Sequence, residues 1–377
     1  MIRVLHIGTK LTAAGGIENY VMNLYKGIDR ENIQFDFIII DDGTQQHYED
    51  VVTSMGGIVY KISESDKSIF QSLYERYKIF RMYKQYGIVH IHTSCGIRVI
   101  EGFLAKLSGI KKIIFHSHSN SGIPPLKYKV IQPFFRLIST NLLACSPEAG
   151  KYFFGNDVIS NDNFKVAKNA INFTEFEYSK EKRKKMQEEL NIKDKNVIGF
   201  VGRLSKEKNL FFLIDVFEAI LRNNPIAQLI IVGDGPIKSE LMEYVHGKEI
   251  SNNVSFLGVR KDIGTIMSFF DLLLLPSFYE GMPVVLIEAQ AAGLKCFTSD
   301  VVSKESQISD LVSYLSLDLT ADQWAKTIIE NKFEYERKNM RETVDKSGYS
   351  MESAALEMTR LYLEQNEKLK CLKKREG

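Results

Sequence analysis

Cysteine is scarce and scattered in this chain of 377 residues. The four cysteines are Cys95, Cys145, Cys296 and Cys371, and no two of them stand at C-x-x-C or otherwise paired spacing. This pattern excludes a disulfide-stapled extracellular scaffold and a zinc ribbon. It fits a protein kept in a reducing compartment, so we expect the chain to be cytoplasmic.

Long hydrophobic runs are absent as well. No stretch reaches the roughly 18 consecutive apolar residues of a membrane-spanning helix. The opening residues, MIRVLHIGTK, resemble a first β-strand more than the charged and then apolar start of a signal peptide. The sequence therefore predicts a soluble protein, or one that binds peripherally to the inner face of the cell membrane.

Neither sign of charge dominates the composition. The 49 Lys and Arg residues stand against 47 Asp and Glu residues, for a formal net charge of +2. Such a balance gives no overall attraction to a polyanion, so we expect no nucleic-acid partner. An anionic ligand would have to be bound by local groups of cations.

Short apolar runs alternate with longer stretches of helical periodicity. The first half has such runs at residues 4–7, 35–40, 58–60, 88–91, 113–116 and 142–145, and the second half at 197–201, 229–232, 254–257, 272–275 and 295–298. This pattern is typical of parallel strands buried on both faces. Because a chain of 377 residues is too long for one ordinary core, it predicts an α/β fold with two doubly wound domains.

A charged, weakly apolar segment, EYSKEKRKKMQEELNIKDKN, separates the two halves. The predicted domains span residues 1–172 and 173–350. Residues 351–377 are predicted to form a helix that crosses back to the first domain and ends in a basic tail. Its apolar positions are Ala355, Met358, Leu361 and Leu363.

A glycine turn, Gly15-Gly16, stands between the first predicted strand and a helix. Glycine lets backbone N–H groups approach a ligand, and a helix N-terminus carries partial positive charge suited to phosphate. A purely structural strand-to-helix turn explains the same residues equally well.

Two cations, Arg203 and Lys208, flank the loop that follows the first strand of the second half. A helix starts near Asn209, so backbone N–H groups also point outward there. Together these groups suit a multiply charged anion, most naturally a diphosphate. Two solvated loop cations remain an alternative for this loop taken alone.

Two further strands are followed directly by glycine at the carboxyl edge of the second predicted sheet. One runs into the G-x-G-P turn at Gly233, and the other ends at Leu257, just before a glycine. Ligands of open α/β sheets bind along that edge, where a flat base could stack or bond to backbone groups. Plain strand-to-helix turns are equally consistent with these residues.

The stretch YEGMPVVLIEA carries Glu280 and Glu288. Pro283 suits the first position of a helix, which places Glu280 before that helix and Glu288 on its second turn. With eight helical steps their α-carbons would lie about 12 Å apart, an arrangement poorly suited to the two carboxylates of a glycosidase. We predict that they accept hydrogen bonds from hydroxyls of an extended ligand, while the helix N-terminus at Gly281 and Met282 faces an anion.

Four features, in order along the chain, resemble the GT-B glycosyltransferases of family 4, which are retaining sugar-nucleotide transferases. They are the turn at Gly15-Gly16, the cations Arg203 and Lys208, the G-x-G-P turn at Gly233, and the E-x7-E pair Glu280 and Glu288. The resemblance covers nearly the whole chain. It implies two Rossmann-like domains facing a central cleft, with the acceptor in the N-terminal domain and the nucleotide sugar in the C-terminal domain.

The resemblance also implies residue roles. Arg203 and Lys208 would bind the donor diphosphate and stabilise the leaving nucleoside diphosphate, Glu280 would hold the donor sugar and Glu288 the ribose. We assign as catalytic Glu280, Arg203, Lys208 and His118, the last beside the transferred sugar with His116 behind it. We assign to donor binding Gly15, Gly16, Arg203, Lys208, Gly233, Leu257, Gly281, Met282 and Glu288.

Metal ligands are not evident in the sequence. No D-x-D motif occurs, so Lys and Arg are expected to replace a divalent cation, and no cofactor is expected. The imidazoles of His90, His92, His116 and His118 stand at predicted strand ends and could in principle converge on a metal. We favour hydrogen bonds to substrate or backbone, because no Asp or Glu sits at ligand spacing nearby.

Basic and aromatic residues recur in two segments of the first half, SLYERYKIFRMYKQY and IPPLKYKVIQPFFRLIST. They include Arg76, Arg136 and an exposed pair, Phe134-Phe135. Such a mixture suits the surface of an anionic bilayer. Ordinary helices with a solvated charged face remain an alternative.

The sequence thus predicts retaining transfer of a hexose-type sugar from a nucleoside-diphosphate sugar, expected to be a UDP-sugar, to an acceptor hydroxyl. The acceptor is expected to be a lipid-linked oligosaccharide in capsule or exopolysaccharide synthesis. One alternative is a non-hydrolysing sugar-nucleotide epimerase, for which the first half offers no carboxylate pair. The other is a catalytically silent transferase-like subunit, which would not require all four of Arg203, Lys208, Glu280 and Glu288.

Overall fold

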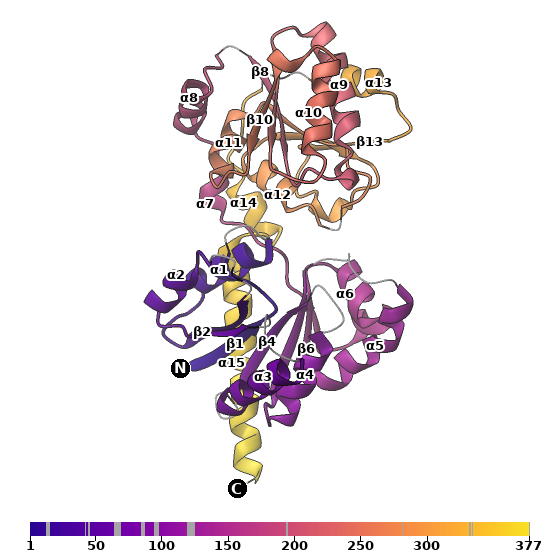
Figure 1. The fold of residues 1–377 in the computed structure, drawn as a ribbon. Helices are drawn as coiled ribbons and strands as arrows, with labels where there is room; N and C mark the ends of the chain where they lie inside the picture. Colours follow the sequence, from indigo (N-terminus) through magenta and orange to yellow (C-terminus); the bar gives the residue numbers. More distant parts are fainter. Residues whose placement is uncertain are drawn as a thin grey trace. The chain divides into compact units, whose positions relative to one another are not determined.

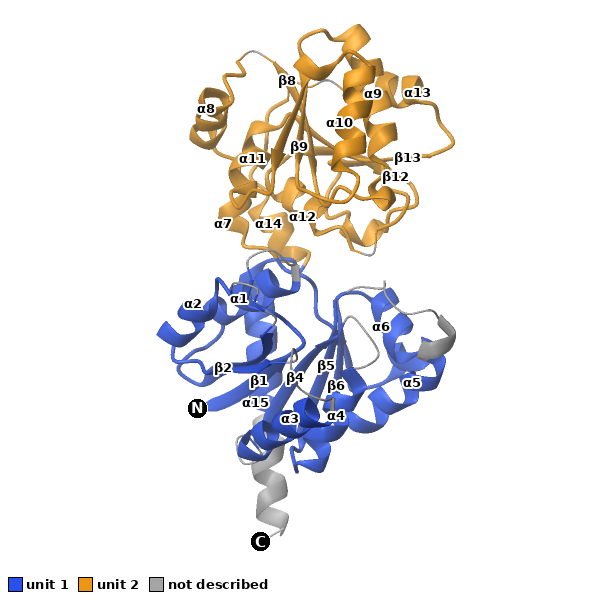
Figure 2. Cartoon of the chain, in the orientation of Figure 1, with its two compact units in different colours: residues 1–170, 348–377 blue, residues 171–347 orange. Residues whose placement is uncertain are grey.

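The computed structural model divides into two compact units, shown in Figures 1 and 2. Unit 1 comprises residues 1–170 and 348–377, and unit 2 comprises residues 171–347. The structure describes residues 1–12, 16–41, 43, 46–63, 69–83, 87–93, 98–118, 125–193, 195–280, 282–331, 333 and 335–376. The predicted Gly15 and Gly281 lie outside these residues.

Unit 1 is built on a seven-stranded sheet in the order β3-β2-β1-β4-β5-β6-β7. Its strands are β1 (Ile2–Ile7), β2 (Ile33–Asp41), β3 (Val59–Ser63), β4 (Ile88–Thr93), β5 (Lys112–Ser117), β6 (Asn141–Ala144) and β7 (Phe164–Val166). Neighbouring strands are parallel throughout. The strand order reverses between β1 and β4, where open α/β sheets form a crevice at their carboxyl ends.

The helices of unit 1 connect these parallel strands. They are α1 (Gly16–Gly27), α2 (Glu49–Ser54), α3 (Ile69–Tyr83), α4 (Arg98–Leu107), α5 (Pro125–Ile138), α6 (Pro147–Phe154) and the 3-10 turn η1 (Asn156–Ser160). The last helix of the chain, α15 (Met351–Glu376), also belongs to this unit (Figure 2).

Helix α15 completes the core of unit 1. Ala355, Met358 and Leu361 are buried in one cluster with residues of β1, α1 and β2. The Cβ of Ala355 is 3.3 Å from the position that a Cβ on Gly27 would take, so α15 and α1 pack closely. The prediction that Leu363 belongs to the apolar face of this helix is wrong, because its side chain is 36% exposed. Tyr362 is buried instead.

Unit 2 is built on a six-stranded parallel sheet in the order β10-β9-β8-β11-β12-β13. Its strands are β8 (Asn196–Val201), β9 (Ala227–Val232), β10 (Val254–Gly258), β11 (Leu272–Leu275), β12 (Lys295–Ser299) and β13 (Val312–Leu315). Here the strand order reverses between β8 and β11. The prediction of an α/β fold with two parallel sheets is confirmed.

The helical segments of unit 2 lie between its strands and at its two ends in the sequence. They are α7 (Phe173–Phe176), α8 (Lys180–Glu189), η2 (Lys206–Lys208), α9 (Leu210–Asn223), α10 (Lys238–Gly247), η3 (Ser251–Asn253), α11 (Ile263–Phe269), α12 (Val284–Ala291), η4 (Lys304–Ser306), α13 (Ala321–Glu330) and α14 (Arg341–Lys346). Among the residues that the structure describes, no helix in either unit combines the length and apolar character needed to cross a bilayer.

The predicted basic and aromatic face of unit 1 is only partly present. Phe134 is exposed, but Phe135 is fully buried and packs edge-on against Phe115. Arg76 is 6% exposed and points inward, where it pairs with Glu101 of α4. The prediction of Phe135 and Arg76 as surface residues is therefore wrong, since the apolar ring fills the core and the cation serves an internal ion pair.

Candidate functional site

Lys208 and Glu280 meet at the point where the strand order of unit 2 reverses. Lys208 ends η2, after β8, and Glu280 follows β11. The Lys208 Nζ lies 2.6 Å from Oε1 and 2.8 Å from Oε2 of the Glu280 carboxylate. Their side chains are 17% and 9% exposed. The structure thus brings together two residues that the sequence separates by 72 positions, at the edge where ligands bind in sheets of this kind.

The Glu280 carboxylate is fixed by its own loop. The hydroxyl of Ser277 donates a hydrogen bond of 2.8 Å to Oε1 of Glu280. Ser277 is fully buried, and its carbonyl accepts a hydrogen bond from the hydroxyl of Ser299 at the end of β12. The N–H of Phe278 donates to the carbonyl of Glu207, 2.9 Å away, and so ties the loop to η2. The carboxylate and the ammonium group are therefore preorganised.

Arg203 stands in the same loop as Lys208 but is exposed. In the described part of the chain, no hydrogen bond or ion pair to a protein group holds its guanidinium. The pKa of Glu207 lies below its ordinary value, first because Ser205 donates to its carboxylate and further because Lys208 and Arg203 are nearby cations. The loop thus has a positive field that can act on an anionic ligand.

The glycines that follow β9 are required by close backbone contacts. Gly233 has φ +131°, and a Cβ on it would lie 1.9 Å from the carbonyl oxygen of Gly202. A Cβ on Gly235 would lie 2.2 Å from the carbonyl oxygen of Leu204. The N–H of Gly233 donates to the carbonyl of Gly258, 2.8 Å away and next to Leu257. The G-x-G-P turn therefore locks the loops after β8, β9 and β10 together.

Glu288 lies on the second turn of α12, as predicted, and is half-buried. Its pKa is raised to about 7, mainly because burial disfavours the charged form and further because of the charge of Glu175. No described residue forms a hydrogen bond or ion pair with its carboxyl group. At neutral pH the group is therefore present in both forms, and it can donate as well as accept hydrogen bonds.

The start of α12 differs slightly from the prediction. Pro283 is the N-cap, with φ −75° and ψ 89°, and the helix begins at Val284. The extended ψ keeps the proline just outside the helix, although its φ suits a first helical residue. Met282 precedes this cap and is partly exposed.

His118 of unit 1 follows β5 directly and is 7% exposed. Its Nε2 lies 2.8 Å from Nδ1 of His92, and its Nδ1 lies 3.2 Å from Oδ1 of Asn169. Burial lowers its pKa to about 4, and the hydrogen bond with Asn169 opposes that shift. His118 is thus a neutral imidazole at pH 7. Gly16, the other residue assigned in this unit, begins α1.

The remaining predicted histidines form a buried cluster, and the sequence analysis missed one member of it. His6, His90, His92 and His116 are fully buried, and they hydrogen-bond to one another, to His118 or to Tyr362. The signal for His6 is its register, because it pairs with His90 across β1 and β4 while His92 pairs with His116 across β4 and β5. Most of the partners that the structure gives for this group are other imidazoles, together with the hydroxyl of Tyr362, and hydrogen bonding to substrate stays a prediction.

Two triads within this cluster have ring nitrogens spaced closely enough to suggest metal ligation. They are His6, His90 and His92, and His92, His116 and His118, with one nitrogen of each residue within 4.8 Å of the others. Zinc bound by imidazoles has Zn–N bonds of about 2.0–2.1 Å. Within these triads the structure gives 2.9 Å between nitrogens of His6 and His92 and 2.8 Å between nitrogens of His92 and His118, and both are hydrogen-bond distances.

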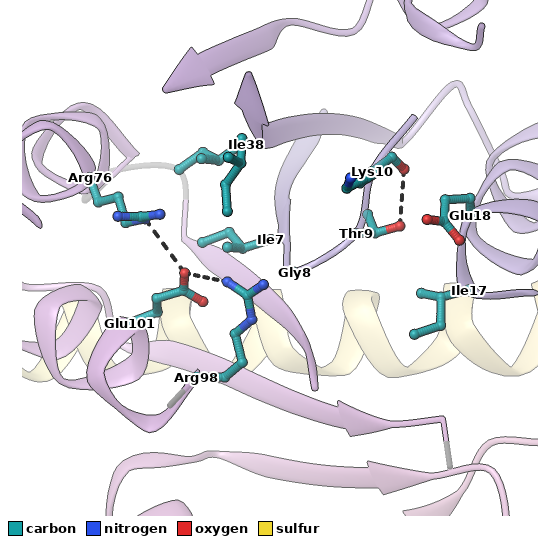
Figure 3. Close-up of a pocket in the computed structure, with 11 residues that line it drawn as sticks. Ile7, Gly8, Thr9, Lys10, Ile17, Glu18, Ile38, Arg76, Arg98 and Glu101 are labelled. Carbon is teal, nitrogen blue, oxygen red and sulfur yellow. Dashed lines mark hydrogen bonds and ion pairs between the residues drawn. The ribbon is translucent and has the colours of Figure 1, made fainter. Parts of the chain in front are cut away.

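A cavity of about 230 Å³ opens in unit 1 at the end of β1. Figure 3 shows Arg76 and Arg98 converging on Glu101, whose Oε1 lies 3.5 Å from Nε of Arg76 and 2.7 Å from an Arg98 nitrogen. Gly8 and Lys10 line the same cavity. Arg98 and Glu101 were not predicted from the sequence, and their place becomes evident only from the reversal of strand order beside β1.

Two family models match adjoining parts of the chain. Residues 14–175 match the family described as Glycosyltransferase Family 4, and residues 181–351 match the family described as Glycosyl transferases group 1. The matched segments correspond to most of unit 1 and most of unit 2.

Two curated relatives and one solved structure extend this result. The chain is 30% identical over 357 residues to the putative glycosyltransferase EpsF of Bacillus subtilis (strain 168), a match that covers 92% of each chain. It is 28% identical over 242 residues to the UDP-Gal:alpha-D-GlcNAc-diphosphoundecaprenol alpha-1,3-galactosyltransferase of Escherichia coli, covering 61% of this chain and 62% of that protein. The crystal structure of Anabaena Alr3699/HepE in complex with UDP-glucose aligns with a TM-score of 0.70 at 16% identity, over 98% of this chain and 100% of the other.

The likeness to the Anabaena structure is one of fold, and it agrees with the two parallel sheets described above. The alignment with EpsF extends over nearly the whole of both chains. Since the motifs, the fold and this alignment agree, the chain belongs to the family 4 glycosyltransferases of the GT-B fold.

Proposed function

We propose that this glycosyltransferase moves a hexose-type sugar from a UDP-sugar to an acceptor hydroxyl and keeps the anomeric configuration. The observation that carries the proposal is the Lys208–Glu280 pair at the strand-order reversal of unit 2, with Arg203 open to ligand beside it. Lys208 and Arg203 can attract the diphosphate of a sugar nucleotide because both are cations of one loop. The carboxylate of Glu280 can accept hydrogen bonds from the hydroxyls of its sugar.

Charge stabilisation is the main contribution expected from this site. As the bond between the sugar and the diphosphate breaks, negative charge grows on the departing phosphate oxygen. Lys208 is held by Glu280 before the reaction, so it stabilises this charge without a large reorganisation, and Arg203 of the same loop adds a second positive charge. In a front-side displacement, that same phosphate oxygen accepts the proton of the attacking hydroxyl. No enzyme nucleophile and no metal is required by this route.

The other assigned residues bind the rest of the donor in this proposal. Glu288 accepts from the ribose hydroxyls, the backbone near Leu257 and Gly233 faces the base, and Met282 stands at the helix start that faces the diphosphate. The solved Anabaena structure is a complex with UDP-glucose, which supports a uridine nucleotide as the donor carrier. We also propose that His118 donates a hydrogen bond to a hydroxyl of the substrate.

The acceptor is proposed to be a lipid-linked oligosaccharide in capsule or exopolysaccharide synthesis on the cytoplasmic face of the membrane. Support comes from the name of the Escherichia coli relative, which transfers galactose to a diphosphoundecaprenol-linked sugar. A second relative is named as a capsular polysaccharide glycosyltransferase of Staphylococcus aureus, 24% identical over 344 residues.

The test is a panel of nucleoside-diphosphate sugars incubated with the purified protein, with and without a membrane-lipid extract. We expect release of free nucleoside diphosphate from one UDP-sugar, stimulated by lipid, unchanged by EDTA and abolished in Glu280→Ala. The anomeric configuration of the product, read by NMR, tests retention. Conversion of a donor to its epimer without release would contradict the transferase, and an inverted product would contradict the mechanism.

A further inference from the structure

Five imidazoles occupy one face of three neighbouring strands in unit 1. They come from β1, β4 and β5 and from the residue after β5: His6, His90, His92, His116 and His118. Tyr20 of α1 packs edge-on against His116 and His118, with ring centroids 5.6 Å and 5.3 Å apart, and Tyr362 of α15 bonds to His90. The cluster is thus a polar layer between the sheet and two helices.

All five rings are neutral at pH 7. Burial lowers the pKa of His6 to about 3 and that of His118 to about 4, and it lowers the pKa of each of the other three well below 6.5. A neutral imidazole has one N–H donor and one lone pair. Each hydrogen bond between two such rings therefore fixes which nitrogen of both carries the proton.

The amide of Asn169 sets the direction of one chain of rings. Its Oδ1 can only accept, so Nδ1 of His118 carries the proton, and Nε2 of His118 must accept from Nδ1 of His92. Nε2 of His92 then accepts from Nδ1 of His6, 2.9 Å away. All three rings have the proton on Nδ1, and the chain ends at Nε2 of His6, a buried lone pair with no partner among the described residues.

Such a chain holds its last ring but does not conduct protons. One end of the chain is an amide oxygen, which does not take up a proton at neutral pH, and the other end is a lone pair in the core. The chain therefore fixes which ring nitrogen of His118 carries the proton. Because His92 occupies Nε2, the polar atom that His118 can turn to a ligand is the Nδ1–H donor.

The two bonds of His118 differ in length. The bond to His92 is 2.8 Å and the bond to Asn169 is 3.2 Å. A substrate hydroxyl would replace the longer bond, accepting from Nδ1–H in place of the Asn169 amide, while the shorter bond stays.

A second chain in the same layer provides an internal control. Tyr362 bonds to Nδ1 of His90 at 2.6 Å, and Nε2 of His90 lies 3.2 Å from Nδ1 of His116. His90 is as buried as His92 and its ring stacks on that of His92, with centroids 4.5 Å apart. No described hydrogen bond joins it to His118.

We propose that His92 is a positioning residue for the transfer reaction, which holds His118 as a hydrogen-bond donor through Nδ1. His6 continues the chain and keeps His92 in the matching tautomer. The effect on catalysis rests on the proposed function, whereas the hydrogen-bond pattern itself belongs to the protein without ligand.

The first test is NMR of the full chain with ¹⁵N-labelled histidine, without ligand. We expect the proton of His118 on Nδ1, with signals assigned through His118→Asn. His92→Leu should move the Nε2 resonance of His118, His92→Asn should restore it because an amide nitrogen replaces Nδ1, and His90→Leu should leave it unchanged. A proton on Nε2 in the wild type, or an Nε2 resonance that does not respond to His92→Leu, would overturn the proposal. So would stoichiometric metal bound to these rings in the purified protein, measured by elemental analysis.

The second test is steady-state kinetics of the same variants. His92→Leu should lower kcat about tenfold, the effect expected for one hydrogen bond, with KM for the donor within about twofold of wild type. His92→Asn should recover most of kcat, and His90→Leu should retain it. Equal losses in His92→Leu and His90→Leu would reduce His92 to a structural role and overturn the proposal. A wild type that consumes no donor would instead overturn the proposed function and leave the NMR result to decide the role of His92.

Discussion

The two units carry their polar residues in opposite ways. In unit 2, Arg203, Lys208 and Glu280 are charged groups on loops beyond the strand ends, partly open to solvent. In unit 1, four of the five histidines stand on the strands themselves and are fully buried, and His118 follows β5 and is 7% exposed; all five are uncharged at pH 7. Loop positions leave charges accessible to water or to an ionic ligand, whereas a sheet face packed under helices tolerates only groups that can become neutral and bond to one another.

The largest expected effect is acid unfolding of unit 1. The folded pKa values of its five histidines lie below the ordinary value of 6.5, at about 3 for His6 and about 4 for His118, so the unfolded state binds protons first and stability is lost as the pH falls below 6.5. Each ring that stays neutral in the folded state removes about 1.4 kcal/mol per pH unit, so His6 and His118 alone remove about 4 kcal/mol at pH 5, a large part of the stability of a domain, and the other three rings act in the same direction.

Two optical signals separate the units in this experiment. Trp324 is the single tryptophan of the chain and is buried in unit 2, so its fluorescence reports that unit, while far-ultraviolet circular dichroism reports both. We expect part of the dichroism to be lost near pH 5 before the fluorescence changes. Native dichroism that persists to pH 4 would show that the imidazoles of unit 1 are not held neutral.

The next largest effect concerns a charge of unit 2. Lys208→Ala should lower turnover about 100-fold or more, by analogy with the loss of one preorganised charge-stabilising donor. Lys206→Ala is the matched control, because Lys206 lies on the same 3-10 turn and is exposed. Turnover close to wild type in Lys208→Ala, or an equal loss in Lys206→Ala, would remove Lys208 from the site.

A third comparison sets a fully buried phenol against a partly exposed one. Tyr362→Phe removes the hydroxyl that bonds to His90, and we expect the free energy of unfolding to fall by about 1–3 kcal/mol because a buried ring nitrogen loses its partner. Tyr244→Phe removes a hydroxyl that donates to Asp215 in a partly buried part of unit 2. We expect it to lower the free energy of unfolding by about 0.5 kcal/mol. Urea denaturation of both variants measures the difference, and equal values would contradict the contrast between the units.

The smallest effect is expected at Arg203. Because the guanidinium is exposed, Arg203→Ala should leave the melting temperature unchanged and lower kcat/KM for the donor about tenfold, the value of one charge-assisted hydrogen bond. Arg222→Ala is the control, since Arg222 is an exposed cation of unit 2 paired with Asp322. A melting temperature lowered by Arg203→Ala would show that Arg203 supports the fold and is not an open ligand group.

The sequence predicts the strands of the sheets well where they are apolar and continuous. It misses the edge strands β7 and β13, because the three residues Phe164–Val166 and the mixed stretch Val312–Leu315 carry too little hydrophobic signal. It names Lys208 and Glu280 but not their ion pair, since contact between distant loops depends on the order of β8 and β11 in the sheet.

The histidine layer shows where local pattern fails. His90-x-His92 and His116-x-His118 are visible in the sequence, and alternation along a strand predicts that each pair shares one face. His6, Asn169 and Tyr362 join them only through strand register and the return of α15. The sequence therefore indicates that polar side chains share one face of the sheet, but it does not indicate which groups form hydrogen bonds with them.

The return of α15 to unit 1 has a consequence for synthesis on the ribosome. Residues 171–347 make up unit 2, so that unit is continuous and can fold as soon as it leaves the exit tunnel. Unit 1 is begun first and finished last, because Met351, Ala355 and Tyr362 emerge only after the whole insertion has been made. Until then His90 lacks its phenol partner, and the apolar residues of α1 that pack on α15 lack that cover.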